Sequence, residues 1–204
     1  MPKRVLLGVA AALVVAACAT STSTRRAAPP TIAETIAAQI AREDGIPWAQ
    51  KRPLTWADFK GKPPSNAGVV AAETAYTIVH GVQCAGSKFD FRVVAAFRPR
   101  DSWVRPTMLR TPADSARALR HEQTHFDLSE VHARRLRRYF GEHMSPCAVS
   151  SGELEARADQ IERDEKAAQE RYDRETDHGR ALAAQSRWDK EVDTQLVSLA
   201  KFVR

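Results

Sequence analysis

The sequence predicts an α+β domain in which a small antiparallel sheet is followed by a long helical hairpin and a terminal helix. Two observations predict it. Residues between 69 and 97 are rich in β-branched and aromatic side chains, and from Pro112 almost to the last residue apolar side chains recur with helical spacing. Without its first eighteen residues, the chain is long enough for one domain with a core and too short for two of ordinary size.

Residues 1–18 have the features of an export signal: a basic start, an apolar run over residues 5–17, and small residues before Cys18. The segment Val15-Ala16-Ala17-Cys18 resembles the lipobox of bacterial lipoproteins, which implies that Cys18 is acylated and anchors the protein to a membrane. Because Ala19 is not an acidic inner-membrane retention residue, the resemblance implies the outer membrane, facing the periplasm. Ordinary cleavage with a chance cysteine is the alternative.

The chain is expected to divide into a signal peptide over 1–18, a tether and short helix over 19–46, and the main domain over 47–204. Small, polar and proline residues make up the tether. The short helix is predicted by isoleucines four residues apart at Ile36 and Ile40.

Two cysteines remain after Cys18, and an exported protein reaches an oxidising compartment. Cys84 with Cys147 is then the only possible internal disulfide.

The formal net charge of +6 includes two basic residues of the signal. Much of the remaining excess lies in one run, which contains Arg134, Arg135, Arg137 and Arg138. On an amphipathic helix such a run predicts a solvated face, so nucleic acid is not an expected partner.

Residues 69–79 and 89–97 are predicted to form neighbouring strands, as an antiparallel pair with a long connection. Before them, Trp56 and Phe59 stand among turn-forming residues and predict an ordered loop packed by the two rings. Beyond Pro112 we expect three helices, which run to about Gly141, from about Ser151 to Gly179, and from about Ala181 to Phe202.

The strongest chemical signal is His121-Glu122-Gln123-Thr124-His125 within the first long helix, an HExxH pattern. Residues four apart on a helix share one face, so both imidazoles can reach one zinc ion. Glu122 lies beside them and can take a proton from zinc-bound water. In random order, this composition gives the pattern on the order of 0.01 times per chain.

A third ligand is expected from elsewhere, since catalytic zinc usually has three protein ligands and one open position. His132 is excluded because it lies about 16 Å along the helix from His121. No glycine breaks the helix after His125, so the ligand must come from the second long helix. Two residues there qualify: Glu165, which interrupts an apolar stripe, and His178.

Several motifs between about Leu54 and Trp188 share the order and spacing of a known family. They are Trp56-Ala57-Asp58-Phe59-Lys60-Gly61, Ser102-Trp103, the segment from His121 to Asp127, Tyr172-Asp173 with Thr176, His178 and Gly179, and then Gln185 and Trp188. Together they resemble a bacterial family catalogued as domain of unknown function 922 and proposed to comprise secreted zinc-dependent proteases.

The resemblance implies a zincin-like fold, with His121 and His125 as zinc ligands and Glu122 as general base. It also favours His178 over Glu165 as the third ligand, because a histidine of the family pattern falls on His178.

Three further residues of these motifs have possible roles. Asp127 and Asp173 could orient a ligand imidazole from outside the coordination sphere. Tyr172 could donate a hydrogen bond to a developing oxyanion, and packing is the alternative for it.

These observations predict a zinc-dependent metallopeptidase of the bacterial cell envelope, in which Glu122 activates the water that hydrolyses a peptide bond. Peptides or proteins are then the substrates. The first alternative is a zinc-holding but non-proteolytic envelope lipoprotein that acts as a binding or structural module. The second is a structural lipoprotein in which the histidines are incidental.

Overall fold

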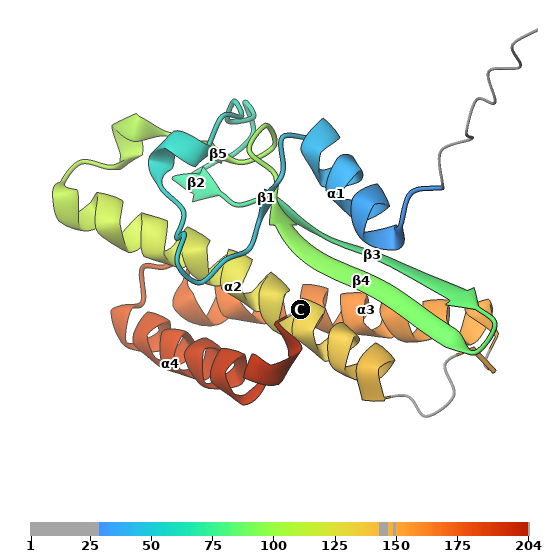
Figure 1. Ribbon diagram of the computed structural model, residues 1–204. Helices are drawn as coiled ribbons and strands as arrows, with labels where there is room; N and C mark the ends of the chain where they lie inside the picture. Colours follow the sequence, from blue (N-terminus) through green and yellow to red (C-terminus); the bar gives the residue numbers. More distant parts are fainter. Residues whose placement is uncertain (1–28, 143–146, 149, 204) are drawn as a thin grey trace, which may run out of the picture.

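The computed structural model describes residues 29–142, 147–148 and 150–203. The predicted signal peptide and Cys18 lie outside the described residues. Within them, the chain forms four α-helices and two small sheets, in agreement with the predicted α+β class (Figure 1).

Both sheets are antiparallel. The larger one has the order β1-β4-β3, and the smaller one pairs β2 with β5. The strands are β1 (Ile46–Pro47), β2 (Ala72–Glu73), β3 (Tyr76–Ala85), β4 (Lys88–Phe97) and β5 (Trp103–Val104).

The connection between β3 and β4 is a tight hairpin turn and not the long loop that was predicted. Their register runs without interruption from Tyr76 opposite Phe97 to Ala85 opposite Lys88. Both strands therefore extend through the segment expected to be loop, and only two residues join them. Gly86, with a φ of 64°, adopts the left-handed conformation that such a tight turn requires.

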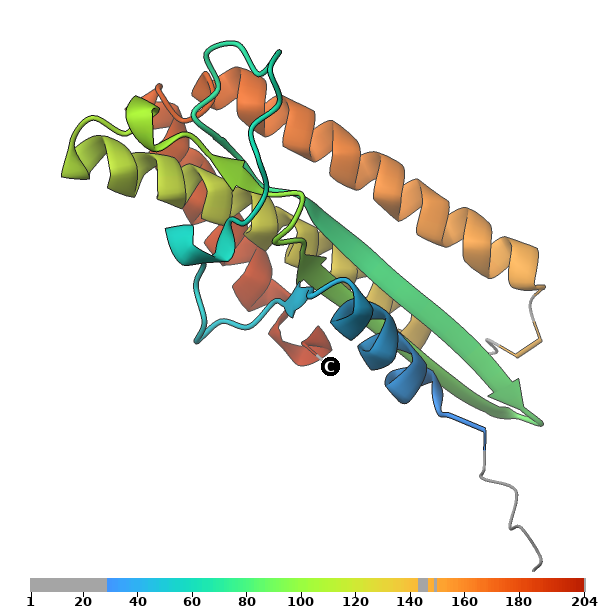
Figure 2. The same ribbon diagram turned by 90° about the horizontal axis from the view of Figure 1, so that it is seen from above.

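The helices agree with the predicted order. They are α1 (Ile32–Arg42), α2 (Pro112–Glu142), α3 (Ser151–Thr176) and α4 (Leu182–Ser198), with 3-10 turns η1 (Trp56–Asp58), η2 (Pro106–Met108) and η3 (Ala200–Phe202). α3 returns alongside α2, and α4 packs against both (Figures 1 and 2). In the described part of the chain, no helix is both long and apolar enough to cross a membrane.

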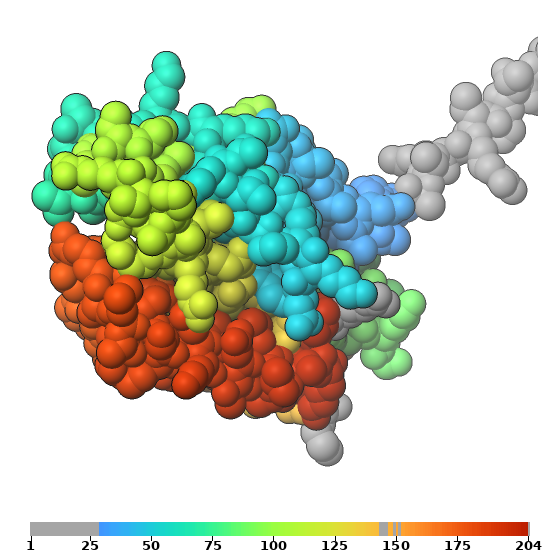
Figure 3. All heavy atoms as spheres, turned by 90° about the vertical axis from the view of Figure 1, so that its left-hand side faces the viewer, coloured from blue at the N-terminus to red at the C-terminus, as the bar shows by residue number. Residues whose placement is uncertain are grey.

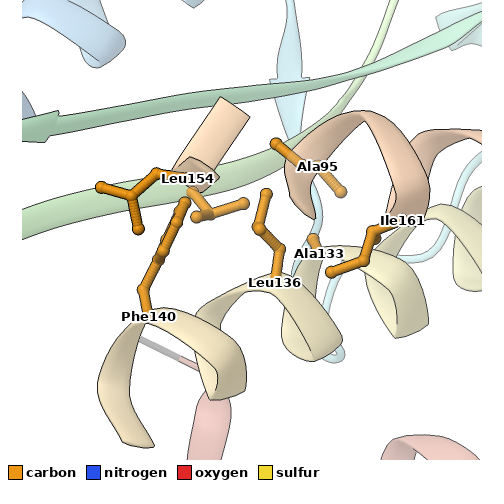
Figure 4. Packing of buried hydrophobic residues seen from close by; sticks show 8 residues of the cluster. Ala95, Ala133, Leu136, Phe140, Leu154 and Ile161 are labelled. Carbon is orange, nitrogen blue, oxygen red and sulfur yellow. The ribbon is translucent and has the colours of Figure 1, made fainter. Parts of the chain in front are cut away.

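The sheet is covered on both faces. Ile36 and Ile40 of α1 pack with Val79 and Val94 on one face, so this helix is part of the folded domain. On the other face, strand and helix residues form one apolar cluster, which includes Ala95, Ala133, Leu136, Phe140, Leu154 and Ile161 (Figure 4). This cluster joins β4 to both long helices and fixes how α3 lies against α2.

The predicted disulfide is present: Cys84 at the end of β3 is bonded to Cys147, which lies between α2 and α3. It links the tip of the hairpin to the connection between the long helices.

The basic run of α2 is only partly the solvated face that its sequence predicts, because Arg138 is exposed and Arg135 is half-buried. Arg134 and Arg137 are buried, and both guanidinium groups donate to Oε1 of Glu130, each at 2.8 Å. They also donate to backbone carbonyls, Arg134 to Leu196 and Arg137 to Val93. These two arginines tie α2 to the sheet and to the C-terminal segment, because a buried charge is stable only when paired and hydrogen-bonded.

Candidate metal centre

α2 brings His121 and His125 together. The two rings project from the same face of the helix with their centroids 4.7 Å apart. Their Nε2 atoms lie 3.1 Å from each other and point to the same position. Both rings contact Tyr172 of α3, which is stacked on His121.

α3 completes the group with Asp173. Its Oδ1 atom lies 3.1 Å from Nε2 of His121 and 3.1 Å from Nε2 of His125. The three ligand atoms therefore form a triangle with equal sides. Over the described residues, these three form the one group of at least three histidine, cysteine or acidic residues whose ligand atoms are close enough to hold a metal ion.

The other ring nitrogen of each histidine contacts a glutamine. Nδ1 of His125 lies 2.6 Å from Oε1 of Gln169. Nδ1 of His121 lies 3.1 Å from Oε1 of Gln185. Both glutamines are buried. Each histidine thus has its Nδ1 atom against a glutamine and its Nε2 atom against the Asp173 carboxylate.

The pKa values of Asp173 and His125 in this group depend on one another. Burial raises the pKa of Asp173, but hydrogen bonds from His121 and His125 outweigh it and hold the net pKa well below the usual range. Burial lowers the pKa of His125, but Asp173 and Glu122 outweigh it and raise the net value. Both shifts have one cause, since a carboxylate that faces two imidazoles stabilises positive charge between them. A proton or a metal ion can supply that charge, and the two compete.

Glu122 lies beside the triangle and is 4% exposed. Its Oε2 atom is buried and has no hydrogen-bond partner among the described residues. Burial raises the pKa of this carboxyl group, while His125 and His121 lower it by a smaller amount. A buried carboxylate oxygen without a partner is unusual in a folded protein and points to a role in binding or proton transfer.

A cavity of about 510 Å³ opens onto the group. Its floor includes His121, Glu122, His125 and Asp173, and its opposite wall is formed by residues 69–74. Figure 3 faces this end of the molecule, where the blue-green and yellow-green segments lie above the orange turn that joins α3 to α4. The three residues of the triangle and Glu122 thus border the cavity.

The two residues expected as third ligand lie near the triangle but outside it. His178 has a half-exposed side chain, and its Nδ1 atom is 3.4 Å from Oδ1 of Asp173. Glu165 is buried, and its Oε1 atom accepts from Nε2 of Gln169 at 2.7 Å. Oδ1 of Asp173, by contrast, lies 3.1 Å from both Nε2 atoms.

Two other motif residues are held by neighbouring groups, and Tyr172 has the packing role that was the alternative for it. Tyr172 is fully buried, and its hydroxyl group bonds Gln185 and the carbonyl of His121. It therefore supports the ring of His121 and does not line the cavity. Asp127 accepts hydrogen bonds from Trp48 and Gln123, so it ties a loop to α2 rather than orienting an imidazole.

Gly179 allows the turn after α3 to approach the triangle. It has a φ of 78°, and a Cβ atom at this position would lie 3.0 Å from Cβ and Cγ of His121. His178 and Asp177 before it also have positive φ values. A glycine is needed here, both for its backbone conformation and for the close contact with His121.

The sequence analysis gave Asp173 only the role of orienting a ligand imidazole, and it singled out neither glutamine. A signal for the first was available, because Gln169 and Asp173 are four residues apart and share one face of α3. Gln185 and Asp189 have the same spacing on α4. Glutamine and aspartate are common on solvated helices, so this spacing by itself does not indicate a functional site.

The comparisons with known proteins identify one family. Residues 58–179, more than half of the chain, match the family described as bacterial protein of unknown function (DUF922). No curated protein and no solved structure matches the chain. The matched region contains every residue of the triangle, and the chain belongs to this bacterial family of unknown function.

Proposed function

We propose that this protein is a zinc-dependent metallopeptidase of the bacterial cell envelope, with zinc held by His121, His125 and Asp173. The observation that carries the proposal is the triangle of ligand atoms, whose three sides all measure 3.1 Å. In a tetrahedral site with bonds of about 2.0 Å, ligand atoms lie about 3.3 Å apart. Two imidazoles and one carboxylate also suit the chemistry of zinc.

Asp173 replaces both earlier candidates for the third ligand in this proposal. With three protein ligands, a catalytic zinc ion keeps one position for water or substrate. The cavity provides access to that position, because all three residues line it. His178 also lines the cavity and remains available to contact a substrate.

When bound, zinc would polarise the carbonyl group of the substrate and acidify the attacking water. The chain's own contribution is proton transfer by Glu122, which accepts a proton from that water and passes it to the leaving amine. Its buried Oε2 atom has no competing partner among the described residues. Positive charge at the triangle acts against the effect of burial and favours the ionised form of this carboxyl group.

The cellular location of the proposal rests on two features. The first eighteen residues predict export and acylation at Cys18. The disulfide between Cys84 and Cys147 is typical of an oxidising compartment such as the periplasm. Both features support a lipid-anchored envelope protein whose membrane contact is made through Cys18.

Metal content tests the site itself. Protein purified without added zinc should contain about one zinc ion per chain. Asp173→Ala should lose it, whereas His178→Ala should keep it, because Asp173 supplies an atom to the triangle and His178 does not. Zinc lost in His178→Ala and kept in Asp173→Ala would contradict the assignment. Peptide-library digestion with and without a chelator then separates a protease from a protein that only holds zinc.

A further inference from the structure

We infer that Gln169 and Gln185 are positioning residues, which hold both metal-facing imidazoles in the tautomer that leaves Nε2 free to bind zinc. The inference rests on the proposed metal site. Each glutamine lies on a different helix, is buried, and presents its carbonyl oxygen to Nδ1 of a different histidine. An oxygen in this position can only accept, so Nδ1 must carry the proton and donate.

The orientation of Gln169 is set by groups outside the triangle. Its Nε2 atom donates to the Glu165 carboxylate at 2.7 Å and to the carbonyl of His125 at 2.9 Å. Rotating the amide by 180° would turn its oxygen toward two acceptors. Glu165 is held in turn by a hydrogen bond with Tyr76 of β3. The tautomer of His125 therefore depends on contacts that reach the sheet.

Gln185 has an equivalent arrangement on α4. Its Nε2 atom donates to Oδ1 of Asp189 at 2.8 Å, which directs its oxygen toward His121. Asp189 is fixed by α2, since Thr124 donates to it at 3.0 Å and Arg120 pairs with it. Each imidazole thus has an amide partner that is anchored by a carboxylate four residues away on the same helix.

An amide has an electrostatic advantage over a carboxylate in this position. Asp173 and Glu122 already place two acidic groups beside the imidazoles, and Glu122 is buried. Carboxylates at positions 169 and 185 would add two more charges at a site with little solvent. The amide oxygens fix the same tautomer without charge, and they leave Glu122 as the nearby proton acceptor.

The test is the zinc dissociation constant of Gln169→Leu and Gln185→Leu, measured by competition with a chelator. Loss of a partner to a ligand imidazole typically weakens metal binding by roughly 10- to 100-fold, and we expect that loss in each variant. The matched controls are Gln160→Leu on α3 and Gln195→Leu on α4. Both glutamines donate to an acidic residue four positions away, but they are only half-buried and their oxygens accept from arginines and not from a histidine of the triangle, so zinc affinity should not change.

A double variant separates positioning from folding. Asp189→Asn with Gln185→Glu keeps an oxygen toward His121 and a donor between positions 185 and 189, and the Tyr172 hydroxyl can still donate to position 185. This double variant should recover part of the affinity lost in Gln185→Leu. Thermal unfolding of the zinc-free forms checks that each variant folds. If Gln185→Leu does not fold, its double variant and Gln169→Leu decide the question.

The outcomes for the site and for the glutamines are distinct. Wild-type protein that binds zinc, with folded leucine variants that bind it equally well, would overturn the positioning role and leave the proposed function standing. Failure of the double variant to recover any affinity would also count against positioning. Wild-type protein that binds no zinc would overturn both.

Discussion

At the scale of single residues, the site places three possible ligand atoms beside one carboxylate oxygen that can accept a proton. Nε2 of His121, Nε2 of His125 and Oδ1 of Asp173 converge, and the buried Oε2 atom of Glu122 stays without a partner in the described structure. The positive charge that this arrangement needs is provided by neither Tyr172 nor Gln169, both of which are neutral. A proton or a bound cation can supply that charge, and the proposed zinc ion would do so when all members of the group are deprotonated.

Glu122→Gln tests the proton-transfer role. Glutamine has nearly the same shape but cannot accept the proton, so peptide hydrolysis should fall by about 10²- to 10⁴-fold while zinc content stays unchanged. Zinc analysis and digestion assays on the same preparation measure both. A zinc-containing variant that cleaves as fast as the wild type would refute the mechanism.

At the scale of elements, the site uses one spacing on three helices. His121 and His125 on α2, Gln169 and Asp173 on α3, and Gln185 and Asp189 on α4 are each four residues apart. Side chains at this spacing lie one above the other on a helix face. Each helix can therefore offer two polar groups to the same point, while its other faces pack in the core.

Gly179→Ala tests the turn that joins α3 to α4. Its positive φ and its contact with His121 make a methyl group unfavourable, and we expect a loss of about 1–3 kcal/mol in the free energy of unfolding, together with weaker zinc binding. Urea unfolding and chelator competition measure the two effects. Gly152→Ala is the control, because the added Cβ would have one neighbour at 4.0 Å within α3. Equal stability of the two variants would show that the turn is not strained by a side chain.

At the scale of the whole molecule, α2 connects the site to the core. The N-terminal half of the helix carries His121 and His125, and its C-terminal end packs Leu136 and Phe140 against the sheet and α3. The disulfide of Cys84 with Cys147 and the paired Arg134 and Arg137 hold that second end. The site is therefore built on rigid elements, as precise positioning of metal ligands requires.

The stability of the zinc-free protein should depend on pH through His132, which is buried between α2 and α3 and 2% exposed. Burial, with Arg135 nearby, lowers its pKa from the usual 6.5 to about 4. Between these values the unfolded chain binds a proton that the folded protein does not bind. The free energy of unfolding should therefore fall as pH drops through this range, by at most about 1.4 kcal/mol per pH unit.

Urea unfolding at a series of pH values measures this effect. Other groups titrate in the same range, so the informative quantity is the difference between wild type and His132→Gln. The variant lacks the group and should show a shallower fall. Parallel curves for the two proteins would exclude His132 as the cause.

The sequence by itself determined the local features of this protein. Periodicity predicts the α+β class, the three C-terminal helices and the pair of imidazoles on one helix face. The direction of a side chain repeats with a fixed period along a helix or a strand, and this period can be read from residues close together in the sequence. The disulfide followed from the cysteine count, since only Cys84 and Cys147 remain after Cys18.

Only the tertiary structure decided which residues meet across elements. The register between α2 and α3 is set by the packing of the apolar cluster, and it brings Asp173 rather than His178 or Glu165 to the two imidazoles. The same packing buries Arg134 and Arg137 against the sheet and the C-terminal segment. Such contacts depend on how side chains of distant segments fill a common volume, and local sequence patterns do not contain that information.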